Sequence, residues 1–257
     1  AGAAGSIGVD ALIRSPADGN TLGTLASATL LANLMGGKLN FDPLKGYTPV
    51  CMGYEIALVM VVNPSLLPKV QSVKALQEAA QAQPGQINYS TSSYGSAAHL
   101  LGESLQGAGN FKMTYVPYKG AAPALQGLLG GEIGVLFADL VTVLPHIKSG
   151  NVRALVVGSS KRVSELPQVP TLIESGYNFH ATSWNAVAAP PGLPERTLAD
   201  LQQHFAVALN DPEVKKRMAN AGASAAYMPA DQLKRFIASE YASWARIIQE
   251  RNIKPQG

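Results

Sequence analysis

The sequence predicts an α/β fold of two lobes, and three observations lead to this prediction. Between Ser72 and Ser159, helical and extended patterns alternate four times, an order typical of a parallel sheet with helices on both faces. The extended runs in this region are continuously apolar, as doubly covered strands are. Two longer extended segments, Met52 to Asn63 and Thr182 to Ala189, flank the alternating region. If both segments cross between lobes, the chain enters the second lobe once and returns once.

These two crossings define the predicted domains. Residues 1–62 with residues 188–257 are expected to form the first lobe, and residues 63–187 the second. A chain of 257 residues is long enough to bury two modest cores. Two crossing strands between two α/β lobes form a hinge, so we expect a ligand cleft between the lobes.

The composition excludes several classes of protein. With 47% hydrophobic and 14% charged residues, the chain is globular rather than disordered. The densest basic stretch is Lys215-Lys216-Arg217, so no extended nucleic-acid surface is predicted. The longest apolar run, Ile56 to Val62, is too short to span a membrane, which takes about twenty residues. The single cysteine, Cys51, excludes an intrachain disulfide and is expected in the core.

The first lobe is expected to contain short strands and longer helices. Ala1 to Ile13 reads as a glycine turn entering a helix, with Ser6 as its cap. Thr21 to Leu25 is a predicted strand, and Asn33 to Pro49 is expected to be irregular. The carboxyl-terminal part adds a strand over Ala223–Tyr227 and helices over Pro194–Leu209, Pro212–Ala221 and Pro229–Arg251.

A long β-branched run, Pro49 to Asn63, leads from the first lobe to the second and is expected to be a central strand. A capped helix over Ser72–Gln83 follows and is stopped by Pro84-Gly85. Beyond residue 101 we expect strands over Lys112–Tyr118, Ile133–Ala138 and Val152–Val157, helices over Ala122–Leu129 and around Pro145, a connector with a short helix over Pro167–Gly176, and an extended segment over His180–Ala189.

Gln86 to Leu101 carries the clearest indication of a binding site. Ile87 and Tyr89 favour a strand, four hydroxyl residues follow from Ser90 to Ser93, and Ser96 stands where an N-cap would precede a helix. The first amides of such a helix have no intrahelical partner and lie at the positive end of its dipole, so they favour a carboxylate or phosphate. The same residue types also serve an ordinary capped helix start, which is the alternative interpretation.

The first lobe repeats these features at two places. Ser6 begins a helix after a glycine turn, and Ser27 and Thr29 follow the end of a predicted strand, where open α/β sheets bind ligands. The glycines of AGAAGSIG superficially suggest a dinucleotide fingerprint. That interpretation is disfavoured because their spacing is not G-x-G-x-x-G and no strand precedes them.

The sequence gives little support to catalysis. Its histidines are scattered, and none has a second ligand at metal spacing, so neither a metal nor a cofactor is predicted. These histidines are His99, His146, His180 and His204. His99 lies close enough to Ser96 to act as a base, but a histidine that bonds a neighbouring backbone group is the commoner arrangement. Trp184 and Trp244 are expected to pack in the core or the hinge.

Stretches along essentially the whole chain resemble the Bug (TctC-like) substrate-binding proteins of tripartite tricarboxylate transporters. The stretches that carry this resemblance are AGAAGSIG, PADGNTL, FDPLKGYTPV, STSSYGSAAHL, VPYKGAAPALQGLLGGEI, LPHIKSGNVRALVV, SSKRVSELPQVPTLIESG, ATSWNAVAAPPGLP and DPEVKKRMANAGA.

The resemblance implies a periplasmic receptor of the Venus-flytrap type, similar to type II periplasmic binding proteins. Such a receptor holds a small carboxylate between two α/β lobes and presents it to the permease subunits of a membrane transporter, with no cofactor. By this resemblance, the ligand-binding residues are Gly5, Ser6, Ser27, Thr29, Thr91, Ser92, Gly95, Ser96, Ala97 and Asp139.

The chain departs from the family pattern in two ways. Members of the family normally have a strand, a helix and a second strand before the AGAAGSIG-like motif, so we expect the first lobe to lack this piece and its sheet to have an open edge. Many relatives carry Asp directly after the phenylalanine of the VLFADL strand, whereas here Ala138 follows Phe137 and the acid is Asp139.

Two other functions are consistent with the residues alone. One is an α/β hydrolase-like enzyme that uses His99 and a hydroxyl. The other is a ligand-sensing module that passes a signal to a partner protein.

Overall fold

The computed structural model describes residues 3–254, which form two compact units. Unit 1 comprises the described part of Ala1–Ile56 and Ser183–Gly257, and unit 2 is Ala57–Thr182. The chain therefore passes from unit 1 to unit 2 once and returns once. Gly2, which belongs to the glycine-rich opening, lies outside the described residues.

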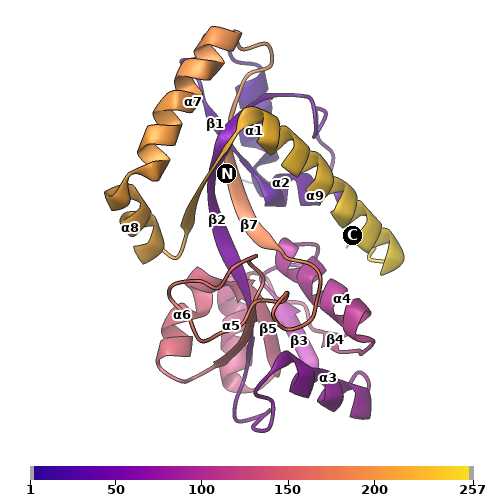
Figure 1. Cartoon of the computed structure of the whole chain (residues 1–257). Coiled ribbons are helices and arrows are strands. Elements are labelled where there is room, and N and C mark those ends of the chain that lie inside the picture. The colour runs from indigo at the N-terminus through magenta and orange to yellow at the C-terminus, as the bar shows by residue number, and fades with distance from the viewer. Residues whose placement is uncertain (1–2, 255–257) are drawn as a thin grey trace. The chain divides into compact units, whose positions relative to one another are not determined.

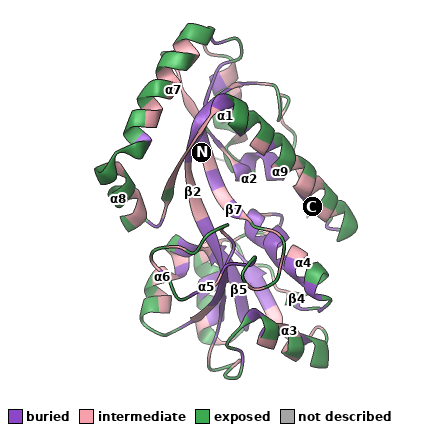
Figure 2. Ribbon diagram, in the orientation of Figure 1, coloured by how far each residue is buried: buried purple, intermediate pink, exposed green. Residues whose placement is uncertain are grey.

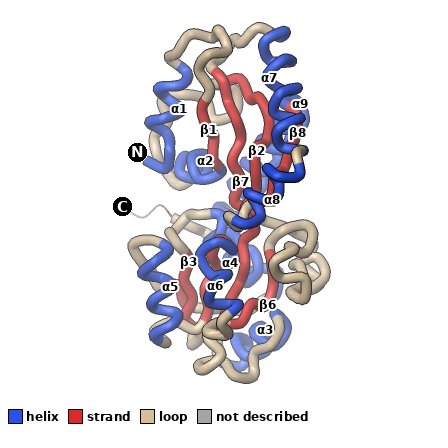
Figure 3. Tube along the Cα trace, turned by 90° about the vertical axis from the view of Figure 1, so that its left-hand side faces the viewer, coloured by secondary structure: helices blue, strands red, loops and turns tan. Residues whose placement is uncertain are grey.

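Unit 1 is built on strands in the order β1, β7, β2, β8 (Figures 1 and 3; β8 is labelled in Figure 3). Their bounds are Gly23–Ala26 for β1, Thr182–Ala189 for β7, Thr48–Val62 for β2 and Ser224–Pro229 for β8. β1 pairs antiparallel with β7, and β8 pairs antiparallel with the first part of β2. Among the described residues β7 is the only strand beside β1, so β1 is an edge strand of this sheet.

Six helical segments accompany this sheet in the described part of unit 1. They are the 3₁₀ helix η1 (Ala3–Gly5) and the α-helices α1 (Ser6–Ile13), α2 (Ser27–Leu34), α7 (Glu195–Asn210), α8 (Pro212–Asn220) and α9 (Ala230–Glu250). Local chemistry accounts for the start of α8: the Asp211 carboxylate accepts hydrogen bonds from the Glu213 and Val214 amides at 2.8 and 3.0 Å, and Pro212 occupies the first turn. The apolar face of α7 packs on buried Val50 and Cys51 of β2. This contact confirms the core position expected for Cys51.

Unit 2 is built on a sheet in the order β6, β2, β5, β3, β4. Its own strands are β3 (Asn88–Thr91), β4 (Thr114–Tyr115), β5 (Val135–Asp139) and β6 (Arg153–Val157). β3 runs parallel to β4 and β5, whereas β2 is antiparallel to both β5 and β6. The crossing strand β2 thus inserts between strands that all run the other way.

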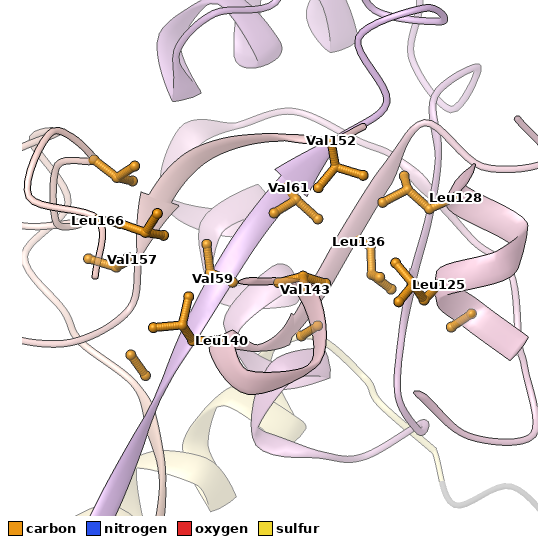
Figure 4. Close-up of a cluster of buried hydrophobic side chains, with 14 of the residues drawn as sticks. Val59, Val61, Leu125, Leu128, Leu136, Leu140, Val143, Val152, Val157 and Leu166 are labelled. Atoms are coloured by element: carbon orange, nitrogen blue, oxygen red, sulfur yellow. The ribbon is translucent and has the colours of Figure 1, made fainter. Parts of the chain in front are cut away.

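Helices cover both faces of the unit 2 sheet. They are α3 (Val73–Ala82), α4 (Ala97–Gly109), α5 (Ala121–Gly130) and α6 (Leu140–Lys148). α3 and α4 lie on one face, with α5 and α6 on the other (Figures 1 and 3). In unit 2, every second residue of β2 and β5 points to the face covered by α5 and α6. Val59, Val61 and Leu136 are examples, and they pack with these two helices in one buried cluster (Figure 4). The period-2 alternation of side chains explains why one strand serves two cores.

Burial follows the same pattern in each unit. The strands are mostly buried, and the outward faces of the helices are exposed (Figure 2). α3 shows the sequence logic behind this: Val73, Leu76 and Ala80 are buried on one face, and the Ser72 hydroxyl caps its start by accepting the Ala75 amide at 3.1 Å.

Several sequence predictions were wrong in detail. The sheets are mixed rather than parallel-rich, because β2 crosses both units and pairs antiparallel in each. Helix α2 was missed, since its first turn is made of the hydroxyl residues that were interpreted as a strand end. The strand expected over Lys112–Tyr118 is reduced to two residues, and the described connector over Pro167–Gly176 contains turns but no helix.

Candidate functional site

The turn between β3 and α4 gathers five of the predicted ligand-binding residues in unit 2. Thr91 ends β3, and Ser92 to Ser96 form the turn that enters α4 at Ala97. The Thr91 hydroxyl donates to the Ser93 carbonyl at 2.8 Å, and the Ser96 hydroxyl donates to the same carbonyl at 2.7 Å. Two side-chain bonds to one carbonyl hold the turn in a single shape.

Ser96 is the N-cap of α4, as the sequence predicted. Its hydroxyl oxygen accepts the His99 amide at 3.3 Å while its proton is directed to Ser93. The amides of Ala97 and Ala98 belong to the first turn, and no hydrogen bond to either is present in the described structure. These amides, rather than the Ser96 hydroxyl, are the donors left for an anion.

His99 is held as a structural part of this turn. The Gly95 amide donates to His99 Nδ1 at 3.1 Å, and Gly95 itself has a positive φ of 73°. Burial lowers the pKa of His99 to about 4, although the nearby Glu103 carboxylate partly offsets this. A neutral imidazole that accepts at Nδ1 carries its proton on Nε2. This arrangement leaves no ring lone pair for proton abstraction and matches the backbone-bonded alternative.

Aromatic rings line the other side of the turn. The Tyr94 ring lies 4.3 Å from the His99 ring and 5.4 Å from the Tyr115 ring, centroid to centroid. The Tyr115 hydroxyl lies 3.4 Å from Thr91 Oγ1. Sequence reasoning did not single out these tyrosines. The only available signal was that Tyr115 lies within the strand expected over Lys112–Tyr118, which is the neighbour of β3.

Asp139 lies at the same edge of the unit 2 sheet as the turn. β3 and β5 are parallel neighbours in which Thr91 stands opposite Phe137, and Asp139 is the last residue of β5. Adjacent parallel strands end together, so the Asp139 carboxyl group and the β3–α4 turn share the carboxyl edge where α/β sheets bind ligands. Val141, two residues further on, is 45% exposed and adds an apolar surface there.

The predicted residues of unit 1 form a second cluster. Gly5 has a φ of 90° and is the N-cap of α1, so Ser6 is the first helical residue and not the cap that was expected. The Thr29 hydroxyl donates to the Ala4 carbonyl at 2.6 Å, and a Cβ at Gly5 would lie only 3.1 Å from Thr29 Oγ1. Glycine is therefore required at Gly5 by both its backbone and its neighbour.

Ser27 joins this cluster to β7. Ser27 is buried, and its Oγ accepts the Trp184 amide at 3.4 Å. A cavity of about 470 Å³ lies beside Gly5 and Thr29 and runs along the open edge of β1, with Ile7 exposed on its rim. Of the four predicted unit 1 residues, Ser27 and Thr29 thus make hydrogen bonds with the backbone of the chain, and Gly5 and Ser6 form the start of α1.

A carboxyl pair lies elsewhere in unit 1 and was not predicted. Burial and the neighbouring Glu55 carboxylate raise the pKa of Glu240 to about 7, and the Trp184 indole N–H opposes this rise. Trp184 is fully buried, stacked on Trp244 and in edge contact with Phe236. Its Nε1 forms no hydrogen bond of ordinary length with any described residue, so its effect on Glu240 is through proximity.

Residues 3–254 contain no group of three or more His, Cys, Asp or Glu side chains close enough to hold a metal ion. Among the same residues, no helix combines the length and the hydropathy that a membrane crossing needs.

Comparison with known proteins decides the family. A family profile described as TctC, tripartite tricarboxylate transporter family receptor, matches residues 1–253. The chain belongs to the TctC receptor family. This TctC receptor is 39% identical to Protein BugT of Bordetella pertussis over 258 residues, which cover 99% of this chain and 78% of BugT. The resemblance seen in the sequence is confirmed.

Solved structures place the TctC receptor in the periplasmic binding protein fold. An R. palustris protein solved with adipate is 28% identical, with a TM-score of 0.82, and the match covers 99% of this chain and 85% of that one. MatC from Rhodopseudomonas palustris, solved with bound malate, is 26% identical with a TM-score of 0.74 over 96% of this chain and 85% of that one. A TctC solute-binding protein from Polaromonas shares the fold at 22% identity, with a TM-score of 0.84 over 97% of this chain and 84% of that one.

Proposed function

We propose that this TctC receptor binds a small carboxylate outside the cytoplasm, in the periplasm, and delivers it to the permease subunits of a tripartite transporter. The family supports the receptor function. The adipate and malate in the two related structures support a carboxylate as the class of ligand.

The observation that carries the proposal is the β3–α4 turn of unit 2. It offers the Ala97 and Ala98 amides at the positive end of a 13-residue helix, and Ser92 belongs to the same turn. Hydrogen bonds to a charged group are worth roughly 1.5–3 kcal/mol each, so two amides and one hydroxyl are sufficient to select a carboxylate. The predicted unit 1 residues and Asp139 are proposed to complete the site.

A charge reversal at the turn tests this site. Ser96→Asp keeps an acceptor for the His99 amide and so remains a competent N-cap, but it places a negative charge beside the Ala97 and Ala98 amides. We expect calorimetry to show no binding of adipate or malate to this variant, while its melting temperature stays close to that of the parent. Ser65→Asp, in an exposed loop of the same unit, is the matched control and is expected to bind normally.

A second variant measures the hydroxyl donor. Ser92→Ala is expected to weaken carboxylate binding about tenfold, the equivalent of about 1.4 kcal/mol. Adipamide, which lacks the charge, is expected to give no thermal shift with any variant. Carboxylate binding that survives Ser96→Asp would remove this turn from the site.

A further inference from the structure

One edge of the unit 2 sheet is open beside a groove. β6 pairs with β2 on one side. On its other side Val157 is bonded by the chain itself: its amide donates to the Pro170 carbonyl at 2.9 Å and its carbonyl accepts the Leu172 amide at 3.1 Å. In residues 3–254, no backbone hydrogen bond beyond those to β2 reaches Arg153, Ala154 or Leu155.

A groove of about 580 Å³ runs along this open part of β6. One wall is the first turn of α3 with the residues before it, and the other is the end of α6 with the loop that follows. Because α3 and α6 cover opposite faces of the sheet, the groove is a slot between two layers with the edge of β6 at its base (Figures 1 and 3). A slot of this form suits one more strand.

The slot has a positive charge. Lys74 and Arg153 line it, and no acidic side chain does so among the described residues. Arg153 is held in place because its Nη1 donates to the Val70 carbonyl at 2.9 Å. Val152, Leu155 and Val169 are buried along the slot and give it an apolar base. An occupant that alternates acidic and apolar side chains would match both features.

We propose that the β6 edge of unit 2 docks an extended acidic segment of a partner protein, which adds as a strand beside Arg153, Ala154 and Leu155. Strand addition obtains its affinity from main-chain hydrogen bonds and its specificity from alternate side chains. The segment continues the strand-like contact that Pro170 and Leu172 make with Val157. This site is separate from the β3–α4 turn and does not depend on carboxylate binding there.

A purely protective edge is the competing explanation. Natural proteins block edge strands with basic side chains and bulges, and the β2–β6 pairing is irregular between Met60 and Val61. A protected edge rejects any added strand, whereas a docking edge accepts an acidic one. The two explanations therefore predict opposite results with a peptide.

The experiment uses the full chain without carboxylate and a fluorescent, end-blocked hexapeptide of alternating glutamate and valine. We expect anisotropy to show saturable binding, and hydrogen exchange to show new protection at Arg153, Ala154 or Leu155. The same peptide with alternate amides methylated keeps its charge but loses its donors, and a lysine–valine peptide reverses the charge. Both are expected not to bind.

Lys74→Glu tests the charge in the protein. Glu is favourable in the first turn of a helix, so this variant is expected to fold normally. It is expected to weaken binding of the glutamate–valine peptide at least about fivefold. Lys112→Glu makes the same charge change at an exposed position of unit 2 away from the groove and is expected to change binding less than about twofold.

Four results would overturn the proposal. The first is absence of binding by the glutamate–valine peptide, since main-chain bonds need no special sequence. The second is equal binding of the methylated peptide, and the third is displacement by millimolar inorganic phosphate, which would identify a simple anion pocket. The fourth is a dimer in sedimentation that the peptide dissociates, which would make a second copy of this chain the occupant.

Discussion

Glu240 gives unit 1 a stability that depends on pH. The pKa of this carboxyl group in the folded chain is about 7, against an ordinary value of 4.5, because of burial and the Glu55 carboxylate. Between these two values the folded state binds more protons than the unfolded state, so the free energy of unfolding decreases as pH rises. The contribution of the Glu240 carboxyl group to the free energy of unfolding is fully present below about pH 4.5 and is lost as pH rises through about 7. At about 1.4 kcal/mol per pKa unit it is at most on the order of 3 kcal/mol.

Glu240→Gln is expected to remove this dependence. Chemical denaturation is expected to show the variant more stable than the parent at pH 8, with the difference vanishing near pH 4.5. Glu250→Gln changes an exposed glutamate of the same helix and serves as the control. A Glu240→Gln variant that loses stability equally at both pH values would show that the carboxyl group has a packing role instead.

At the residue scale, the sequence predicted which residues cap helices, but it did not predict which partners their side chains bond in the folded chain. Ser96 was placed correctly as an N-cap because capping depends on the neighbouring sequence alone. The direction of its hydroxyl proton, toward the Ser93 carbonyl, depends on the shape of the turn and could not be predicted. The Glu55–Glu240 pair joins residues far apart in the chain, and no periodicity indicates it. The ligand-binding roles of the predicted residues stay predictions.

At the element scale, the extended runs and strong caps were placed well. β2, α3 and α7 lie within a few residues of their expected bounds, because long apolar runs and capped amphipathic patterns are local signals. α2 was missed because its buried residues Ser27 and Thr29 are polar, so the apolar period begins only at Leu30. The antiparallel insertion of β2 between β5 and β6 is a long-range pairing that hydrophobic patterns do not encode.

Gly158 tests, at the element scale, the backbone contacts that join the two ends of unit 2. Its amide donates to the Leu58 carbonyl at 2.7 Å and its carbonyl accepts the Ala181 amide at 2.8 Å. A Cβ at Gly158 would lie 2.4 Å from the Ala181 carbonyl oxygen, which is backbone and has little freedom to move. Gly158→Ala is therefore expected to destabilise the chain by about 1–3 kcal/mol.

Urea denaturation measures this effect, and Gly130→Ala is its control. Gly130 is the last residue of α5, and a Cβ there meets nothing within 4 Å. The control is expected to be neutral or slightly stabilising, because alanine favours the helix. Equal stability of both variants would show that the Leu58, Gly158 and Ala181 backbones can separate at no cost.

At the scale of the whole molecule, the two units are expected to close on the ligand. Because the chain passes between them only twice, rotation at these two points needs few backbone changes. Small-angle scattering is expected to show a smaller radius of gyration with adipate or malate than without. The Ser96→Asp variant is expected to show no decrease. Identical dimensions in a parent sample that binds ligand would indicate a rigid single body. The lobe boundaries at residues 62 and 187 stay a prediction.

The two hydrogen bonds of Gly158 bring the two ends of unit 2 together. Leu58 and Ala181 are both bonded to this one glycine, so the first and last residues of unit 2 lie close together although about 120 residues separate them in sequence. A segment with adjacent ends can be inserted into, or removed from, a host without stretching it. Unit 2 is therefore a natural candidate for expression as an independent module, and joining Ile56 to Ser183 through a short linker would leave unit 1 as a continuous protein.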